Sequence, residues 1–263
     1  MMSGALRIPS RQRLVAASRA GALHFLGSLL VAALAAALVF ALWYPYPYRE
    51  LAGGRGLFLL VVAVDVVCGP LLTVVLFNPA KPRAELWRDL GIVVAIQLGA
   101  LGYGLHTVWL ARPLFLVMEK DRFKVIKAVD LVDVAELSKL SPALQPQLFS
   151  GPQVVALREP KDASERKAVL VDSVLGGRDY AERPEFYMPY EGVAALKSLA
   201  KARPLRVFLE RYPAQRELAQ TLASKRGRDM TQWAYLPVVG RQDWIAILDN
   251  TGQIQGFLPG DGF

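Results

Sequence analysis

Histidine and cysteine are scarce in this 263-residue chain. The single cysteine is Cys68, the two histidines are His24 and His106, and neither type occurs after His106. One cysteine excludes an internal disulfide, a Cys-x-x-Cys redox pair and a four-cysteine zinc site. The region after His106 therefore cannot contain a Ser-His-Asp or Cys-His nucleophile system. No glycine-rich phosphate-binding loop occurs, and we expect no catalytic residue, no metal and no cofactor.

Charge is nearly absent from three long segments. No Lys, Arg, Asp or Glu occurs over 20–48 or 90–111, and the segment 57–77 contains only Asp65. A helix needs about 20 apolar residues to cross a bilayer, and helices of soluble proteins seldom run so far without charge. We predict three transmembrane helices, over about 20–44, 57–77 and 90–111, within an N-terminal domain of residues 1–111.

The first apolar segment follows a basic stretch, as a signal peptide would. It exceeds the roughly 7–15 residues of a signal-peptide core. It also ends in an aromatic cluster, Trp43 to Tyr48, instead of a small-x-small cleavage site. Such rings gather where helices leave a membrane, so we predict an uncleaved anchor.

Basic residues near the span ends indicate the orientation. The segment before the first span has four arginines and no acid, and the loop 78–89 has three basic residues against two in the loop 45–56. The positive-inside rule then predicts a cytoplasmic N-terminus and a periplasmic domain of residues 112–263, at the inner membrane of a Gram-negative cell. The net charge of +8 is largely this topology signal, and no basic stripe with interleaved aromatics indicates nucleic-acid binding.

Asp65 lies inside the second predicted span. An intramembrane carboxylate costs about 2.5–3.5 kcal/mol on insertion scales and should face protein or water. With untilted spans, its level on the third span falls near Gly102 and Tyr103, with His106 about one turn away, so Tyr103 and His106 are candidate partners. Two interpretations stay open. A protonated Asp65 holds helices together by hydrogen bonds, or Asp65 receives a polar group from another membrane helix.

Pro70 interrupts the same span. Its ring removes one backbone hydrogen bond and frees the carbonyl of Val66. Gln97, on the third span, lies near that depth and is expected to satisfy this carbonyl. Cys68 is expected to be a small packing residue.

Small residues recur every four positions on two spans: Ser28, Ala32 and Ala36 on the first, and Gly91, Ala95 and Gly99 on the third. Such stripes let helices approach closely. We expect them to pack the three spans together, with a docking stripe for another protein's helix as the alternative.

Residues 112–263 alternate between strand and helix patterns, which predicts a small α+β domain. Strands are expected over 114–129, with a turn at Glu119–Arg122, over 153–157, and over 233–258, with a turn at Asp249–Gly252. Helices are expected over 162–175, capped by Asp162, over 191–202 and over 213–226. Four charged residues near the predicted membrane exit are candidate partner contacts: Arg112, Glu119, Asp121 and Arg122.

Two long motifs, Asp65–Pro82 and Leu105–Phe123, resemble the type IV pilin accessory protein family, the TfpX/TfpZ-like proteins. Two short tail motifs, Tyr235–Gly240 and Phe257–Pro259, resemble it more weakly. The resemblance implies an inner-membrane protein that supports pilin stability or pilus assembly, with a type IV pilin subunit as its partner. It supplies no catalytic mechanism.

The leading hypothesis is therefore a non-enzymatic accessory protein that contacts pilin, membrane lipid and other pilus assembly proteins. One alternative is a membrane-embedded enzyme that modifies pilin or lipid, with Asp65, Glu119 and Asp121 as its acids. Another is a proton- or ion-linked signalling protein that uses Asp65 as a relay, although one acid among three spans makes a poor conduction path.

Overall fold

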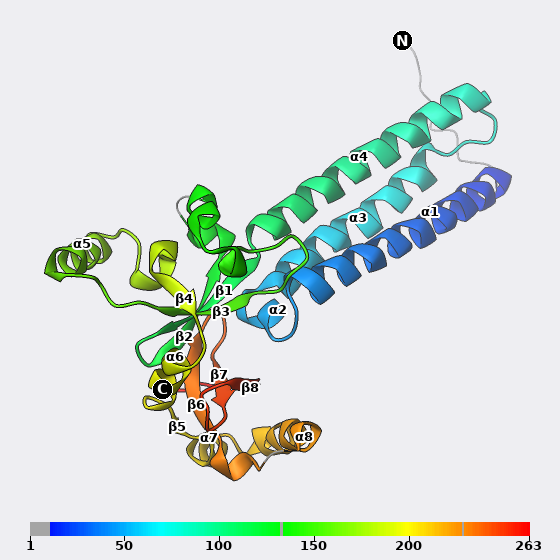
Figure 1. The fold of residues 1–263 in the computed structure, drawn as a ribbon. Helices are drawn as coiled ribbons and strands as arrows, with labels where there is room; N and C mark the ends of the chain where they lie inside the picture. Colours follow the sequence, from blue (N-terminus) through cyan, green and yellow to red (C-terminus); the bar gives the residue numbers. More distant parts are fainter. Residues whose placement is uncertain (1–10, 132–133, 228) are drawn as a thin grey trace. The chain divides into compact units, whose positions relative to one another are not determined.

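The computed structural model describes residues 11–131, 134–227 and 229–263. The chain divides into two compact units (Figure 1). The helical unit comprises the chain up to Val39 together with Arg55–Trp109, and the sheet unit comprises Phe40–Gly54 together with Leu110–Phe263. Each unit is described by itself.

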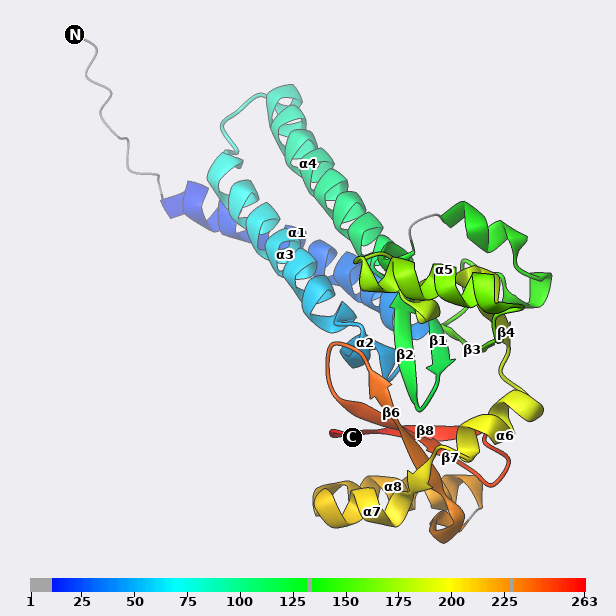
Figure 2. The same cartoon turned by 90° about the vertical axis from the view of Figure 1, so that its left-hand side faces the viewer.

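The helical unit consists of α1 (Arg11–Leu38), α3 (Gly54–Leu76) and α4 (Arg83–Leu110), which lie side by side (Figures 1 and 2). A short π-helix, Val39–Trp43, continues α1. All three helices are long and apolar enough to cross a membrane, which confirms the three predicted spans. All three begin before their apolar runs, at Arg11, Gly54 and Arg83, because the basic flanks beyond the hydrocarbon core also adopt helix.

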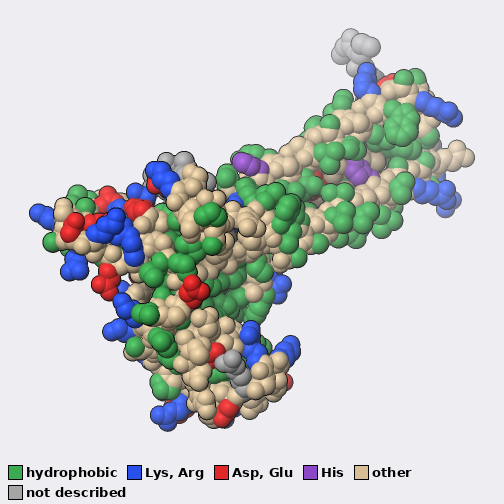
Figure 3. Space-filling model, viewed as in Figure 1, with side chains coloured by type: hydrophobic (Ala, Val, Ile, Leu, Met, Phe, Trp, Pro, Cys, Tyr) green, Lys and Arg blue, Asp and Glu red, His purple; other side chains and the backbone are tan. Residues whose placement is uncertain are grey.

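Apolar side chains cover the outside of the helical unit, and Lys and Arg gather at the end where α1 begins (Figure 3). On α1, Leu23 is 73% exposed and Leu34 is 64% exposed. A surface of this kind is rare on soluble monomers and ordinary for helices that face lipid. The buried side of α1 is made instead of small residues: Ala17, Gly21, Ser28, Ala32 and Ala35. The unit is thus membrane-embedded, with its small residues inside and its large ones outside.

The sheet unit contains one eight-stranded mixed sheet, in the order β4-β3-β1-β2-β6-β7-β8, with β5 paired to β6. The strands are β1 (Pro113–Glu119), β2 (Arg122–Lys127), β3 (Gln153–Leu157), β4 (Tyr187–Pro189), β5 (Arg203–Pro204), β6 (Ala234–Val239), β7 (Trp244–Leu248) and β8 (Ile254–Pro259). The pairs β1–β3 and β2–β6 are parallel, and the other pairs are antiparallel.

Within the described residues, five α-helices accompany this sheet: α2 (Tyr48–Leu51), α5 (Ala163–Val174), α6 (Val193–Leu199), α7 (Leu205–Arg211) and α8 (Arg216–Arg226). Short 3₁₀ helices fill connections at Ala128–Asp130, Val134–Lys139, Pro142–Leu144, Tyr180–Glu182, Pro184–Phe186, Pro213–Gln215 and Met230–Gln232. A membrane protein with three N-terminal spans and an α+β domain is the predicted fold class, which the structure confirms.

Both faces of the central strands are covered. Successive side chains of a strand point to opposite faces, and on β1 Leu116 and Met118 join one hydrophobic cluster while Phe115 and Val117 join another. A third cluster packs α7 and α8 on the other end of the sheet, around Phe208 and Tyr235. The near-continuous apolar run of β1 follows from burial on both faces.

The connection between the first two spans is part of the sheet unit. Tyr48 and Leu51, from α2, are 7% and 1% exposed and belong to the same cluster as Leu116 and Met118. The amide of Arg241 donates a hydrogen bond of 2.6 Å to the carbonyl of Leu51. The Tyr48 ring meets Phe257 edge-on at 5.9 Å. The segment 40–54 therefore helps to form the core of a domain whose other residues follow the third span.

The sequence correctly predicted two local features of the sheet unit, a hairpin turn and a helix cap. The hairpin turn joins Glu119 to Arg122 as predicted, with Lys120 in the left-handed region at φ 55°. The side chain of Asp162 accepts a hydrogen bond of 2.8 Å from the Glu165 amide and caps α5, also as predicted. Helix α6 is shorter than the predicted 191–202, and α7 was not predicted although its buried residues Leu205, Phe208 and Leu209 have helical spacing.

Candidate functional site

Polar groups from all three helices meet at one junction of the helical unit. Nε2 of Gln97, on α4, donates a hydrogen bond of 2.9 Å to the backbone carbonyl of Asp65 on α3, and lies 3.4 Å from Oγ of Ser28 on α1. We call Ser28, Asp65, Gly69 and Gln97 the polar junction. A hydrogen bond of this kind fixes the rotation of each helix about its axis, because apolar side chains alone do so only weakly in lipid.

Gly69 makes room for this contact. A Cβ atom placed on Gly69 would collide with the amide group of Gln97. Both Gly69 and Pro70 are buried in the bundle. The prediction that Gln97 caps the carbonyl freed by Pro70 is off by one residue, since its donor reaches Asp65 and not Val66.

Two acceptors at the junction lack a donor. Oδ1 of Asp65 and Oε1 of Gln97 are buried and receive no hydrogen bond from the described residues. Leaving a buried acceptor unpaired costs about 1–3 kcal/mol. A proton on Asp65, or a donor from another molecule, would remove part of this cost. Both interpretations of Asp65 made from the sequence remain predictions.

Tyr103 and His106 do not join the junction. Both are exposed on α4. A Cβ atom on Gly104 would collide with Val61, which sets the level of the two antiparallel helices. Asp65 then lies level with Ala100, about 3–4.5 Å from the depth expected from the sequence. The expectation failed because it considered depth alone, whereas the rotation of α4 turns Gln97 toward Asp65 and turns Tyr103 outward.

The other histidine, His24, contacts a buried threonine. Its Nδ1 lies 2.5 Å from Oγ1 of Thr73, which is 3% exposed. This pair links α1 to α3 about one turn from the junction. Cys68 is exposed on α3, so it does not fill the bundle interior as a packing residue would.

The two small-residue stripes have different surroundings. Ser28 and Ala32 are buried in the bundle, as predicted for packing. Gly91, Ala95 and Gly99 are exposed, and a Cβ atom on either glycine would have no neighbour within 4 Å. At about 100° per residue, this second stripe lies on the side of α4 opposite Gln97. The three-helix bundle therefore leaves the α4 stripe unused.

In the sheet unit, the predicted contact residues lie at both ends of β1. Arg112 precedes the strand, and burial lowers its pKa to about 10, opposed by Tyr44. Burial raises the pKa of Glu119 at the other end, while the Lys124 charge opposes the rise. Asp121 pairs with Nε of Arg122 at 2.8 Å. Arg122 also stacks on Phe263, with 4.6 Å between the guanidinium carbon and the ring centroid.

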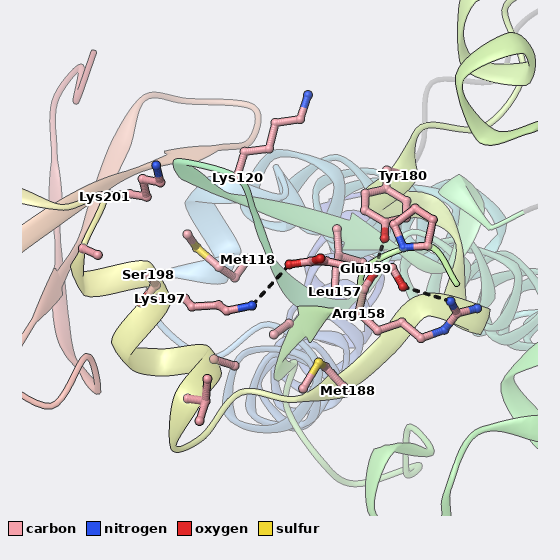
Figure 4. A pocket seen from close by; sticks show the side chains of 15 residues that line it. Met118, Lys120, Leu157, Arg158, Glu159, Tyr180, Met188, Lys197, Ser198 and Lys201 are labelled. Carbon is pink, nitrogen blue, oxygen red and sulfur yellow. Dashed lines mark hydrogen bonds and ion pairs between the residues drawn. The ribbon is translucent and has the colours of Figure 1, made fainter. Parts of the chain in front are cut away.

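A groove of about 740 Å³ opens beside this hairpin. Its apolar floor includes Met118 and Met188, and lysines rim it: Lys120, Lys197 and Lys201 (Figure 4). Lys197 pairs with Glu159 at 3.3 Å, whereas no ion pair with described residues involves Lys120 or Lys201. The sequence did not reveal this groove, because β1, β4 and α6 come from separate parts of the chain.

No group of three or more His, Cys, Asp or Glu side chains is placed to hold a metal ion within 11–131, 134–227 and 229–263. The arrangement offers surfaces for binding: an apolar bundle with one unused stripe, and a groove with a basic rim.

Comparisons with known proteins identify the family. A family model described as "Fimbrial assembly protein FimB" matches residues 12–53, which span α1 and the segment that packs into the sheet unit. The serogroup I fimbrial assembly protein of Dichelobacter nodosus is 35% identical over 97% of this chain and 99% of its own length. The serogroup E1 protein of the same organism is 34% identical over the same shares. A shorter relative from serogroups C1 and C2 is 42% identical over 47% of this chain and 94% of its own length. No solved structure matches. Since two relatives match almost end to end, the chain belongs to the fimbrial assembly protein family, a type IV pilus accessory family.

Proposed function

We propose that this protein is a non-enzymatic accessory factor of the bacterial inner membrane that supports type IV pilin stability or pilus assembly. It does so by binding a pilin subunit through its membrane helices and its periplasmic domain, with the N-terminus in the cytoplasm. The near full-length similarity to fimbrial assembly proteins supports the role in pilus assembly. Membrane lipid and other pilus assembly proteins are its further contacts.

The unused α4 stripe is the structural observation that carries the pilin proposal. Gly91, Ala95 and Gly99 form a shallow strip on a lipid-facing side, with no neighbour near either glycine. Glycine is a poor helix former, about 1 kcal/mol worse than alanine. Small residues stabilise a membrane helix pair because they let the backbone of a second helix approach closely. The stripe therefore offers a binding surface for the membrane helix of a pilin subunit before its assembly into the pilus.

The groove offers the corresponding surface for the pilin head. Its floor is apolar, and Lys120 and Lys201 at the rim have no ion pair with described residues. A head segment with carboxylates beside apolar side chains would match this rim. The two surfaces would hold the two parts of one pilin.

The test is crosslinking in cells that express the pilin. A photo-reactive residue at Ala95 should crosslink to pilin, and one at Ala33, which is exposed on α1, should not. In separate strains without a photo-reactive residue, Ala95→Leu should lower the number of surface pili, while the matched change Ala33→Leu leaves it unchanged. Normal piliation and pilin abundance in a strain without the gene would contradict the proposed function.

The unpaired acceptors of Asp65 and Gln97 favour one second candidate, a proton-linked membrane signalling role. Asp65→Asn keeps the shape and removes the titratable group. A loss of piliation in this variant at unchanged protein level would favour proton linkage. Full piliation would refute proton linkage and leave the accessory role as the remaining function.

A further inference from the structure

One turn of the sheet unit presents two large apolar side chains at its tip. The turn spans Gln147–Ser150, and the Ser150 amide donates to the Gln147 carbonyl at 3.4 Å. The Ser150 hydroxyl accepts a hydrogen bond of 3.2 Å from the Gln147 amide and donates one of 3.3 Å to the Gln147 carbonyl. Leu148 and Phe149 occupy the tip and are 53% and 66% exposed. Turn tips in water favour Asn, Asp, Gly, Pro and Ser instead.

The same turn is tied to the end of the first span. Nε1 of Trp43 donates a hydrogen bond of 3.3 Å to the carbonyl of Leu148. Gly151 packs against Pro45, and a Cβ atom on Gly151 would lie 3.0 Å from Cγ of that proline. Trp43 is the last residue of the helix that begins at Arg11. Tryptophan at this position marks the interface between hydrocarbon and headgroups.

We infer that Leu148 and Phe149 insert into the outer lipid interface and anchor the extracytoplasmic domain to the bilayer. The hydrogen bond to Trp43 holds the tip at the depth where the first span ends. Lipid is the occupant because the tip adjoins a span end, where acyl chains and headgroups surround the protein. The anchor does not require pilin. A result that refutes the anchor therefore leaves the proposed function untouched, and the reverse also holds.

Spin-label accessibility tests the anchor in the full-length chain. The chain carries Cys68→Ala and is reconstituted into vesicles of phosphatidylethanolamine and phosphatidylglycerol. Three single-cysteine variants are labelled in turn: Phe149→Cys, Leu34→Cys on the lipid-facing side of α1, and Leu175→Cys beyond α5. Leu175 is 80% exposed. Collisions with oxygen, which concentrates in lipid, are compared with collisions with a water-soluble nickel chelate.

The oxygen-to-nickel collision ratio at Phe149→Cys should be shifted from that of Leu175→Cys toward that of Leu34→Cys. A ratio equal to that of Leu175→Cys would place the tip in water and overturn the inference. Low collision with both reagents would place it against protein and overturn the inference equally.

A second measurement separates insertion from a change of fold. A label at Gln147→Cys should move toward the aqueous ratio when Leu148→Asn and Phe149→Asn are introduced, because asparagine keeps the turn and removes the apolar tip. A label at Leu175→Cys should not change. An unchanged ratio at Gln147→Cys would also overturn the inference.

Discussion

Truncating Leu51 tests whether the connection between the first two spans belongs to the core of the sheet unit. Leu51 is 1% exposed and packs in one cluster with Tyr48, Leu116 and Leu236. A Leu→Ala change at a buried site costs about 2–5 kcal/mol, because it loses both transfer free energy and packing. For a domain of this size, 1 kcal/mol shifts the Tm by about 2–4 °C. Leu51→Ala should therefore lower the Tm of the sheet unit by about 7–14 °C at the middle of that range.

The assay is the resistance of the sheet unit to protease, measured against temperature on the full-length protein in detergent. The matched control is Leu59→Ala on α3, where the leucine is 52% exposed. Its transition should stay within about 1–2 °C of the wild type, as for most surface changes. Equal transitions for the two variants would refute the assignment of α2 to the sheet core.

Three further predictions concern the junction and the cap of α5. Gly69→Ala should destabilise the helical unit by about 1–3 kcal/mol, because the added methyl group collides with Gln97. The amount of protein found in membranes should fall. The control Gly56→Ala, in open space on the same helix, should leave that amount unchanged. Asp162→Ala should cost about 1 kcal/mol of α5 stability, seen as faster amide exchange in that helix, with Ser164→Ala as the unchanged control. Arg158 and the Lys161 amide lower the pKa of Glu165 from 4.5 to about 2. Since the folded-state pKa is the lower one, this stabilisation is present above pH 4.5 and is lost as the pH falls toward about 2. Amide exchange in α5 should accelerate over that window, and Glu165→Gln should abolish the dependence.

Features that depend on neighbouring residues could be predicted from the sequence. The spans follow from length and absence of charge, because a helix in lipid must satisfy its own backbone. The hairpin at Glu119–Arg122 and the cap at Asp162 follow from side chains within a few positions of each other. The turn at Asp249–Gly252 is confirmed by a hydrogen bond of 3.0 Å from the Gly252 amide to the Asp249 carbonyl.

The candidate surfaces depended on orientation and were predicted less well. Depth along α4 was estimated to within about 4.5 Å, but its rotation placed Gln97 and not Tyr103 beside Asp65. The same rotation turned the stripe of Gly91, Ala95 and Gly99 outward. Sequence spacing shows that residues share a face, and only packing shows what that face meets.

By itself, the sequence determined that this protein has three membrane helices, an α+β domain and no histidine or cysteine in residues 112–263, because composition and local periodicity carry that information. Only the tertiary structure decided that residues 40–54 complete the sheet domain and that Trp43 holds the turn at Leu148. These contacts join residues far apart in the chain. The same holds for the parallel pairing of β1 with β3 and of β2 with β6, which no local pattern specifies.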